Sequence, residues 1–514
     1  MEHSILSTFP IEVNKKFPEK TALYFYGKEI SYEKLDSMVG RLAKGLEEKF
    51  RIQPGDVLAI QTTNTIEFVY VLLACWRIGA SLSPINPSLK AEEIHYQLEH
   101  SRAKCYFYQD DIEYKAREAI SHIKTDIISI RISSDPRVSK DGWDLPAVTL
   151  DDGLDAKKVS REEIGLIIYT SGTTGKPKGV LLTHSNIIEM CKMSIKSFQL
   201  TENDRSFLIL PLFHVNAIIF TLTSVLMQGG SVVIRKKFIA DEFLPAVDQY
   251  KPTFTSGVPT VYRYLADLPK GIEDQYDLSS MRFSICGAAP VSISLFEQFE
   301  SRFPFKLIEG WGLSEGTCAS TLNPLDGKRK VGSIGKPLDK QSLKVVDESG
   351  EEVPIGEYGE LTVKGPNVMK GYLRNEEETR KVLNNGWLST GDIGYQDEDG
   401  YFYIVDRKKD MIIRGGMNIY PKQIEEIIFQ LPDVLEAAVI GVPDDLYGEE
   451  VVAYVVLKSG SNLTSAAIIE HCQSKMANYR CPKEVYKIEE IPKNSVGKVT
   501  KGVLRSLYSP SLNK

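Results

Sequence analysis

The stretch YTSGTTGKPKGV, residues 169–180, lies between two apolar runs of the chain, IGLIIYT at 164–170 and GVLLTH at 179–184. It contains three glycines, one proline, two lysines and four serine or threonine side chains. Glycine and proline are the poorest helix formers, and a polar run of this kind has no apolar face to bury. The flanking apolar runs are typical of buried strands, so the stretch predicts a loop that joins one strand to the next.

The composition of this loop suits a phosphate group. Glycines let backbone N–H groups point inward, the serine and threonine hydroxyls add donors, and lysines add charge. A Walker A loop is disfavoured, because Gly172 and Gly175 are too close together and Pro177 follows Lys176. Most loops of this composition are solvated surface turns, so composition alone leaves both interpretations open.

On the N-terminal side of the loop, the pattern alternates between helices and short strands. Residues 31–50 carry apolar side chains near a 3.6-residue period, which predicts a helix. Residues 56–62 read as a buried strand, followed by a helix through Cys75. Such alternation favours an α/β sheet domain.

On the C-terminal side of the loop, the pattern of predicted elements changes twice. Short β-rich runs between turns predict a β subdomain over about residues 331–406, with a hairpin turn at EDGY, residues 398–401. After a charged, glycine-rich link, a helix is predicted to begin at Pro421, followed by strands at 435–442 and 450–457 and a helix at 466–476. We therefore expect an N-terminal domain at 1–406 and a separate α+β domain at 407–514.

The bulk composition excludes several classes of protein. The hydrophobic share is 42%, the charged share 25% and the net charge −7, with a pI of about 5.7, so no basic domain indicates nucleic-acid binding. The N-terminus lacks the pattern of a signal peptide, and no apolar run is long enough for a membrane span. Seven cysteines without a CxxC pair indicate reduced thiols in a cytoplasmic protein, and no His/Cys metal cage is visible.

The loop is one of a series of segments that resemble the adenylate-forming superfamily, in the branch of the acyl-CoA synthetases. The loop itself is similar to the superfamily's phosphate-binding signature. Further similar segments follow in the superfamily's order and span nearly the whole chain: LPLFHVNA (210–217), GAAP (287–290), GWGLSE (310–315), STGDIG (389–394), VDRKKDMIIRGGMNIYP (405–421) and PKNSVGKVTK (492–501).

The resemblance implies a fold and a reaction. The fold is a large N-terminal domain of two α/β subdomains plus a β subdomain, with a small mobile C-terminal domain. The reaction is attack of a carboxylate on the α-phosphate of ATP, giving an acyl-adenylate and pyrophosphate, and then attack of a thiol that releases AMP. It implies ATP, Mg²⁺ and coenzyme A as cofactors, with an acyl-carrier protein as the alternative acceptor. We expect a cytoplasmic monomer or homodimer without stable membrane insertion.

The resemblance also assigns the nucleotide-binding residues one by one. Thr170 and Glu315 would hold Mg²⁺, and Asp392 would accept hydrogen bonds from the ribose hydroxyls. Trp311, where the superfamily usually has tyrosine, would pack against adenine, and Ser314 replaces the usual threonine. Arg407 would contact ribose or phosphate. The remaining residues expected to bind the nucleotide are Ser171, Gly172, Thr173, Thr174, Gly175, Lys176, Lys178, Gly287, Ala288, Ala289, Glu309, Gly310 and Gly312.

Catalysis and thiol binding are assigned in the same way. Lys498 would bridge the carboxylate and the α-phosphate, and His214 would gate the acyl pocket. Lys409 matches the hinge about which the C-terminal domain is expected to swing. Gly415 and Gly416 would let pantetheine pass close to the backbone. Tyr447, Tyr479 and Lys483 would contact the CoA nucleotide, although Cys481 stands where such relatives have a basic residue.

The identity of the acid remains open. Amino-acid adenylation domains carry an aspartate soon after the position of Phe213, and none occurs between Pro211 and Gly230, so an α-amino acid is disfavoured. The segment resembles synthetases of short, medium or functionalised acyl acids and of some aryl acids. A non-catalytic nucleotide-binding protein is the alternative from another class. The presence of Lys498, Glu315 and Asp392 argues against it.

Overall fold

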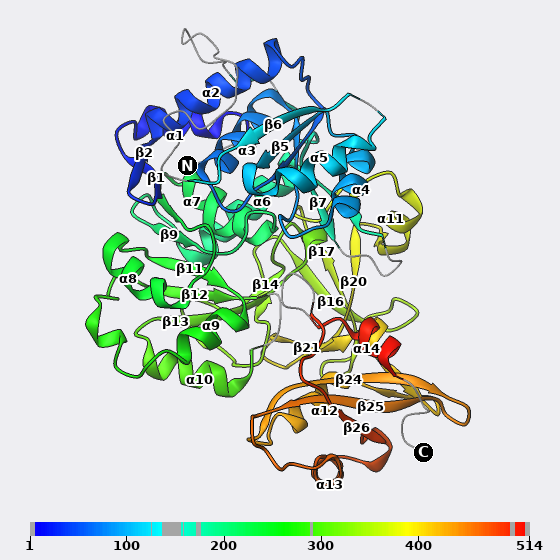
Figure 1. Ribbon diagram of the computed structural model, residues 1–514. Helices are drawn as coiled ribbons and strands as arrows, with labels where there is room; N and C mark the ends of the chain where they lie inside the picture. Colours follow the sequence, from blue (N-terminus) through cyan, green and yellow to red (C-terminus); the bar gives the residue numbers. More distant parts are fainter. Residues whose placement is uncertain are drawn as a thin grey trace. The chain divides into compact units, whose positions relative to one another are not determined.

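A computed structural model of the chain describes residues 6–124, 126–135, 156–157, 159–170, 176–287, 291–493 and 499–508. The chain forms two compact units (Figure 1). The first comprises Met1–Leu343 and Val363–Leu388, and the second comprises Lys344–Thr362 and Ser389–Lys514. This division into compact units does not test the predicted domain boundary at 406/407, which stays a prediction.

The first unit contains a seven-stranded sheet in the order β18-β8-β7-β4-β3-β5-β6. Neighbours from β7 to β6 pair in parallel, whereas β8 is antiparallel to both β7 and β18. The strands are β3 (Val57–Gln61), β4 (Ser81–Pro84), β5 (Cys105–Gln109), β6 (Ile128–Ile132), β7 (Ile164–Thr170), β8 (Lys178–Thr183) and β18 (Gly371–Tyr372).

The same unit contains a nine-stranded sheet in the order β15-β14-β13-β12-β11-β9-β10-β1-β2. Its central strands from β13 to β1 are parallel, so their carboxyl ends share one edge. The strands are β1 (Thr21–Phe25), β2 (Lys28–Ser31), β9 (Arg205–Leu208), β10 (Ser231–Ile234), β11 (Phe254–Gly257), β12 (Phe283–Cys286), β13 (Lys306–Trp311), β14 (Thr321–Leu322) and β15 (Lys336–Pro337).

Helices cover these sheets in layers (Figure 1). The main core contains residues of both sheets and of six helices: α1 (Phe9–Lys16), α2 (Tyr32–Glu48), α3 (Ile66–Ile78), α6 (His184–Phe198), the π-helix at Ala217–Thr223 and α7 (Ser224–Met227). A second core joins the nine-stranded sheet to α8 (Ala240–Tyr250), α9 (Pro259–Ala266) and α10 (Ile293–Arg302). A third core joins the seven-stranded sheet to α4 (Ala91–Ser101) and α5 (Glu113–Ser121).

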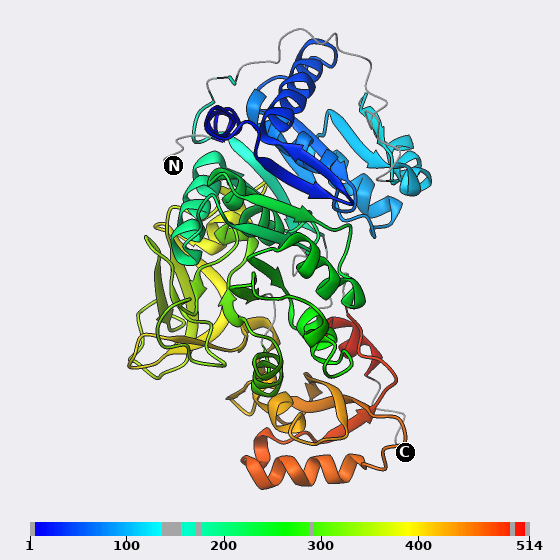
Figure 2. The same cartoon turned by 90° about the vertical axis from the view of Figure 1, so that its left-hand side faces the viewer.

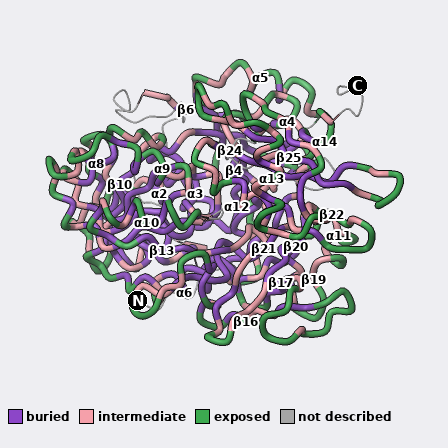
Figure 3. The backbone as a smooth tube through the Cα atoms, turned by 90° about the horizontal axis from the view of Figure 1, so that it is seen from below, coloured by how far each residue is buried: buried purple, intermediate pink, exposed green. Residues whose placement is uncertain are grey.

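Helix α3 shows how the local sequence determines burial and the ends of a helix in this core. All 13 of its residues are buried (Figure 3), as expected of a helix that is apolar all round. It packs against α2, β3 and β4. Its N-cap Thr65 accepts a hydrogen bond from Phe68 N at 3.2 Å, and Gly79 ends it in a left-handed conformation with φ of 78°.

A third sheet, in the order β16-β17-β20-β19 with β21 beside β20, contains the boundary between the two units. Its strands are β16 (Ser342–Val346), β17 (Gly359–Lys364), β19 (Leu383–Asn384), β20 (Trp387–Gln396) and β21 (Phe402–Arg407), and α11 (Glu376–Val382) precedes β19. The predicted turn at 398–401 joins β20 to β21, so the prediction of β-structure here is confirmed.

The rest of the second unit is an α+β body around a sheet in the order β23-β22-β25-β24, with β26 beside β25. Residues of α12 and α13 pack on one face and α14 on the other (Figure 2). The elements are β22 (Ile412–Arg414), β23 (Met417–Ile419), α12 (Pro421–Ile428), β24 (Val434–Asp444), β25 (Gly448–Leu457), α13 (Ser465–Lys475), β26 (Glu484–Lys487) and α14 (Lys501–Leu507).

The structure bears on two properties considered from the sequence, the state of the cysteines and the presence of a membrane span. All seven cysteines lie in the described part of the chain, and all are buried free thiols. Among the described residues, no helix combines the length and apolar character needed to cross a membrane.

Candidate functional site

The loop assigned to phosphate connects paired ends of two neighbouring strands of the seven-stranded sheet. Thr170, the last residue of β7, pairs with Lys178, the first residue of β8. The two strands predicted on either side of the loop are therefore confirmed. Of the residues assigned to the phosphates, Ser171, Gly172, Thr173, Thr174 and Gly175 lie outside the described residues.

Helix α4 supports both flanks of the loop. Tyr96 donates its hydroxyl to Pro177 O at 3.0 Å, and Lys176 Nζ lies 5.9 Å from the centre of the Tyr96 ring. On the other flank, the Tyr169 hydroxyl lies 2.8 Å from His100 Nδ1. The loop thus starts and ends on residues that packing holds in place.

Lys178 is engaged within the protein. Its Nζ forms an ion pair with Glu378 of α11 and lies 5.0 Å from the centre of the Tyr372 ring. Hydrogen bonds from Lys178 and Lys381 lower the pKa of Glu378 to about 2. Because the carboxylate stays charged, Lys178 is held near the loop as a cation.

Glu315 lies in a short helical turn, η4 (Ser314–Gly316), that packs against β8. Its Oε1 accepts a hydrogen bond from the Tyr372 hydroxyl at 3.0 Å, and Ser314 O accepts one from Thr317 N. Strand β8 and this turn therefore bring Glu315, Lys178 and the end of β7 into one region of the first unit.

These residues fit a magnesium ion bound together with a nucleotide. Mg²⁺ prefers oxygen ligands and usually takes one or two from the protein, with the rest from phosphates and water. Tyr372 engages Glu315 through Oε1, and a carboxylate has a second oxygen to offer, while Thr170 brings a hydroxyl. The described residues contain no group of three or more His, Cys, Asp or Glu side chains that could hold a metal by themselves.

The segment assigned to adenine follows the parallel strands β12 and β13. Cys286 pairs with Glu309, so Gly287 and Gly310 lie at neighbouring strand ends, and a Cβ on Gly287 would lie 3.5 Å from Gly310 O. Trp311 is 9% exposed, and Glu309 is buried. Ala288 and Ala289 lie outside the described residues.

Packing within the protein explains two of the glycines in this segment. A Cβ on Gly310 would lie 2.7 Å from Leu322 Cδ2, and one on Gly312 would lie 2.0 Å from Cys318 O. At these two positions, neighbouring segments of the chain pack too closely to leave room for a side chain. These glycines are therefore required by the fold, whether or not a nucleotide lies beside them.

His214 follows β9, at the carboxyl edge of the nine-stranded sheet, and precedes the π-helix at Ala217–Thr223. Burial lowers the pKa of His214 to about 4, so the ring is neutral at physiological pH. Asn64 fixes the segment before it, because its side chain donates to Leu210 O at 3.0 Å and accepts from Leu212 N at 2.8 Å. π-Helical turns are frequent at functional sites.

In the second unit, Asp392 and Arg407 occupy paired positions on β20 and β21, with Arg407 Nε 2.5 Å from Asp392 Oδ1. The Asp392 side chain is 3% exposed and that of Arg407 is 36% exposed. Two residues assigned separately to the ribose therefore lie side by side. Lys409 is exposed in the short turn η5 (Lys408–Asp410) that follows β21.

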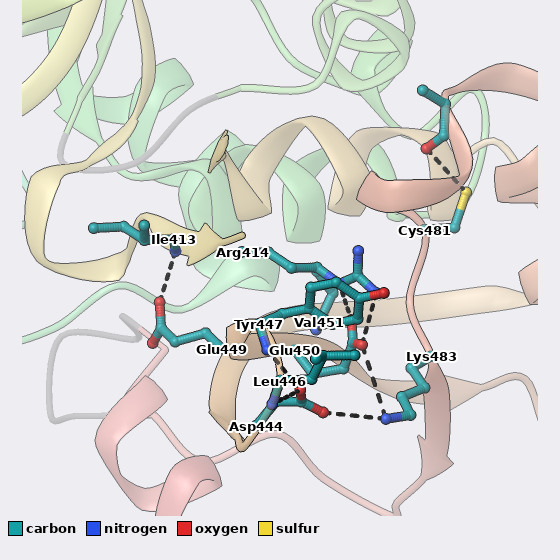
Figure 4. Close-up of polar contacts among 11 residues, drawn as sticks. Ile413, Arg414, Asp444, Leu446, Tyr447, Glu449, Glu450, Val451, Cys481 and Lys483 are labelled. Atoms are coloured by element: carbon teal, nitrogen blue, oxygen red, sulfur yellow. Dashed lines mark hydrogen bonds and ion pairs between the residues drawn. The ribbon is translucent and has the colours of Figure 1, made fainter. Parts of the chain in front are cut away.

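Gly415 and Gly416 form the exposed turn between β22 and β23, with φ of 57° and 80°. Gly415 N donates to Tyr447 O at 2.8 Å, and a Cβ on Gly415 would lie 3.4 Å from the Tyr447 ring. The Arg414 guanidinium lies 4.1 Å from the centre of the same ring (Figure 4). Positive φ favours glycine at both positions.

Lys483 belongs to a network of balanced charges beside this turn (Figure 4). Its Nζ lies 3.3 Å from Asp444 Oδ2 and 3.8 Å from Glu450 Oε2, and Arg414 makes two bonds to Glu450 at 2.6 and 2.9 Å. The hydrogen bond from Lys483 helps to keep the pKa of Asp444 low, after those from the Tyr447 and Leu446 amides. The two cations therefore face two carboxylates.

Cys481 and Tyr479 lie near this network in the sequence but make other contacts. The residue Cys481 is 6% exposed, and burial raises the pKa of its thiol. Its Sγ lies 3.6 Å from Ala477 O. Tyr479 accepts a hydrogen bond from Arg480 Nε at 3.0 Å.

Lys498 lies outside the described residues, but both flanks of its segment are anchored. Lys493 pairs with Val499 in a β-bridge, and Thr500 N donates to Pro492 O at 2.8 Å. Lys501 Nζ lies 2.8 Å from Glu425 Oε1 of α12.

Sequence reasoning missed several residues that shape these sites. Asn64, Tyr96, Tyr372 and Glu378 all act on an assigned residue from a distant part of the chain. Each looks locally like an ordinary loop, helix or strand residue. Only their contacts identify them, and a single sequence does not record contacts.

Comparisons with known proteins find relatives for both parts of the chain. Residues 11–373 match the family model described as AMP-binding enzyme, and residues 423–498 match the AMP-binding enzyme C-terminal domain. The chain is 34% identical to a feruloyl-CoA synthase of Amycolatopsis sp, covering 99% of this chain and 100% of that protein.

Two solved structures show the same fold. ATP-bound MatB from Rhodopseudomonas palustris superposes with a TM-score of 0.89 at 31% identity, over 98% of this chain and 99% of that one. O-succinylbenzoate coenzyme A synthetase (MenE) from Bacillus subtilis, in complex with ATP and a magnesium ion, gives a TM-score of 0.84 at 28% identity, over 97% and 99%. The mixed α/β architecture, with a large N-terminal and a small C-terminal domain, is thereby confirmed.

Proposed function

Because the chain belongs to the AMP-binding enzyme family, whose two domain models match residues 11–373 and 423–498, we propose that it is an AMP-forming acid–thiol ligase. It activates a carboxylic acid with ATP to an acyl-adenylate and then transfers the acyl group to coenzyme A. The observation that carries the proposal is that one chain matches both domain models, up to and including Lys498.

The first half-reaction needs charge neutralisation and positioning more than covalent help from the protein. Glu315 and Thr170 would hold Mg²⁺, which when bound would neutralise phosphate charge. Lys176 and Lys178 would add cations at the end of the loop, and Asp392 would accept hydrogen bonds from the ribose. Lys498 would stabilise the charge that develops between the attacking carboxylate and the α-phosphate.

The second half-reaction needs an open path for a thiol. Gly415 and Gly416 form a turn without side chains, and Gly416 has no neighbouring atom within 4 Å of a Cβ position. A pantetheine arm could therefore pass close to this backbone. Tyr447, Tyr479 and Lys483 remain candidates for the CoA nucleotide, although Lys483 already faces two carboxylates.

For the acid, the proposal is an acyl or aryl carboxylic acid without an α-amino group. The absence of aspartate between Pro211 and Gly230 supports this class, and the buried neutral His214 suits a gate beside an apolar pocket. The similar enzymes named for ferulate and for o-succinylbenzoate both take aryl acids, which makes aryl acids the first substrates to test.

We further propose that the enzyme works in the cytoplasm as a monomer or homodimer. Seven free, buried thiols suit a reducing compartment.

The test is carboxylate-dependent exchange of pyrophosphate into ATP, with magnesium and a panel of fatty, dicarboxylic, aryl and amino acids. Each responding acid is then assayed for AMP release with and without CoA. Exchange with one class and CoA-stimulated AMP release would support the proposal. Exchange without a CoA effect would favour a carrier-protein acceptor, and no exchange with any acid would contradict ligase activity.

A further inference from the structure

A segment that follows β17 in the sequence forms hydrogen bonds with the backbone around Glu315. We name this segment, residues 367–372, the 367–372 strap. Met369 N donates to Glu315 O at 2.8 Å, and Asn367 Nδ2 donates to Gly316 O at 2.8 Å. Thr317 Oγ1 donates back to Asn367 O. The strap therefore holds the backbone at Glu315, whose carboxylate the proposed function assigns to magnesium, and at the two residues that follow it.

Tyr372 ends the strap and reaches the Glu315 side chain itself. It is 8% exposed, pairs with Val180 of β8, and its amide donates to Thr379 Oγ1 at 2.9 Å. Its hydroxyl donates to Glu315 Oε1 at 3.0 Å. A phenol hydroxyl is a hydrogen-bond donor and a carboxylate is an acceptor, so this contact fixes one oxygen of Glu315.

The ring of the same tyrosine supports the loop's second lysine. Lys178 Nζ lies 5.0 Å from the ring centre, and its ion pair with Glu378 fixes the other side of the ammonium group. Only 13% of the Lys178 side chain is exposed. A cation over a desolvated aromatic face is attracted to it. One side chain thus contacts the carboxylate through its hydroxyl and the cation through its ring.

We propose that Tyr372 is a positioning residue for the magnesium–nucleotide site: its hydroxyl orients Glu315 toward the metal, and its ring holds Lys178 beside the phosphate loop. The inference rests on the proposed function, because it requires Glu315 to take Mg²⁺. A Tyr372→Phe substitution keeps the ring that contacts Lys178 and removes only the hydroxyl that contacts Glu315. It therefore tests the contribution of the hydroxyl to the metal site by itself.

The test compares ATP binding by calorimetry with Mg²⁺ and with EDTA in wild type, Tyr372→Phe and a matched control. The control is Tyr32→Phe, because the Tyr32 hydroxyl is also buried but donates to Gly230 O, at 2.6 Å. In Tyr372→Phe we expect the gain in ATP affinity from Mg²⁺ to fall about tenfold, while affinity in EDTA stays within about twofold of wild type. Tyr32→Phe keeps the wild-type gain.

A double-mutant cycle separates positioning from packing. If Tyr372 acts through Glu315, Tyr372→Phe in a Glu315→Gln background causes no further loss of the Mg²⁺ gain. Tyr372→Leu, which removes the ring, is expected to lower ATP affinity in EDTA about threefold below that of Tyr372→Phe. Equal affinities of the Leu and Phe variants would refute the role assigned to the ring.

The outcomes also separate this inference from the proposed function. A wild-type protein whose ATP affinity gains nothing from Mg²⁺ would overturn both. If Mg²⁺ raises the ATP affinity of the wild type and Tyr372→Phe retains this gain in full, only the positioning role is overturned. The same holds if Tyr32→Phe loses as much of the gain as Tyr372→Phe does.

Discussion

Arg407 faces Asp392 across the β20–β21 ladder, with its Nε 2.5 Å from Asp392 Oδ1. The carboxylate is almost fully buried, whereas the guanidinium is 36% exposed. Arg407→Ala takes a charged partner from a buried acid, and we expect it to lower the free energy of unfolding by about 1–2 kcal/mol, less than for a fully buried pair. Urea denaturation measures this loss.

Lys408→Ala is the matched control for Arg407→Ala. Lys408 is 51% exposed and lies 3.0 Å from Glu360 in the same unit, so its removal is expected to change stability by no more than about 0.5 kcal/mol. Equal effects of the two substitutions would mean that the Asp392–Arg407 pair has no special structural role.

Lys498→Ala is expected to slow adenylation on the order of a hundredfold or more while leaving ATP binding largely intact, because its charge matters most in the transition state. Pyrophosphate exchange measures the rate, and calorimetry measures ATP affinity. Lys493→Ala is the control, since Lys493 belongs to the same segment but pairs with Glu436 at 2.6 Å. Wild-type exchange by Lys498→Ala would refute its catalytic role.

Lys409→Pro tests the predicted hinge. Proline fixes φ and would restrict rotation in the turn after β21. We expect thioester formation to fall on the order of tenfold more than adenylation, because only the second half-reaction requires the C-terminal domain to swing. Lys409→Ala, which keeps backbone freedom, should preserve both rates. An equal loss of both half-reactions in Lys409→Pro would contradict the hinge.

The sequence predicted the elements that depend on local patterns. The 3.6-residue period at 31–50 corresponds to α2 at Tyr32–Glu48, and the apolar run at 56–62 corresponds to β3 at Val57–Gln61. The helix predicted to begin at Pro421 begins there, as α12, and ends at Ile428.

Contacts between distant residues could not be predicted in this way. Lys178 was assigned to phosphate from its motif, but its ion pair with Glu378 joins residues 200 positions apart. Gly310 and Gly312 were assigned to the adenine segment from their motif. In the structure, a Cβ at either position would clash with a neighbouring part of the chain, Leu322 or Cys318. The motifs therefore propose a site, whereas the packing around the assigned residues could be described only from the structure.

The Glu425–Lys501 pair makes the stability of the second unit depend on pH. Burial raises the pKa of Glu425 above its ordinary value of 4.5, and Lys501, 2.8 Å away, opposes the shift. A raised carboxyl pKa favours the folded state most at low pH, and that contribution is lost as the pH rises through the folded pKa. Lys501→Met removes the opposing charge, so its cost is expected to grow with pH.

We expect Lys501→Met to lower the free energy of unfolding by about 2–3 kcal/mol at pH 8 and by less at pH 5. Urea denaturation at the two pH values measures the difference. Lys493→Met, which breaks a pair with 34% exposed partners, should cost little at either pH. A larger cost at pH 5 than at pH 8 would contradict the assigned pairing.

His184 should make the first unit sensitive to acid. The side chain is fully buried at the start of α6, and neither ring nitrogen has a hydrogen-bond partner among the described residues. Burial lowers its pKa from 6.5 to about 4. Below pH 6.5 the unfolded chain therefore takes up a proton that the folded chain refuses, and stability is lost progressively between pH 6.5 and 4.

Because one pKa unit corresponds to about 1.4 kcal/mol, this residue should account for about 2 kcal/mol of the stability lost between pH 6.5 and 5. His184→Leu keeps an apolar side chain in the cavity without the titrating group, so its unfolding free energy should fall less steeply over that range. Urea denaturation at pH 7, 6 and 5 gives the slopes, with His122→Ala at an exposed position as the control. If His184→Leu keeps the wild-type slope, the buried ring has found a partner that lets it charge within the fold, and acid sensitivity must arise elsewhere.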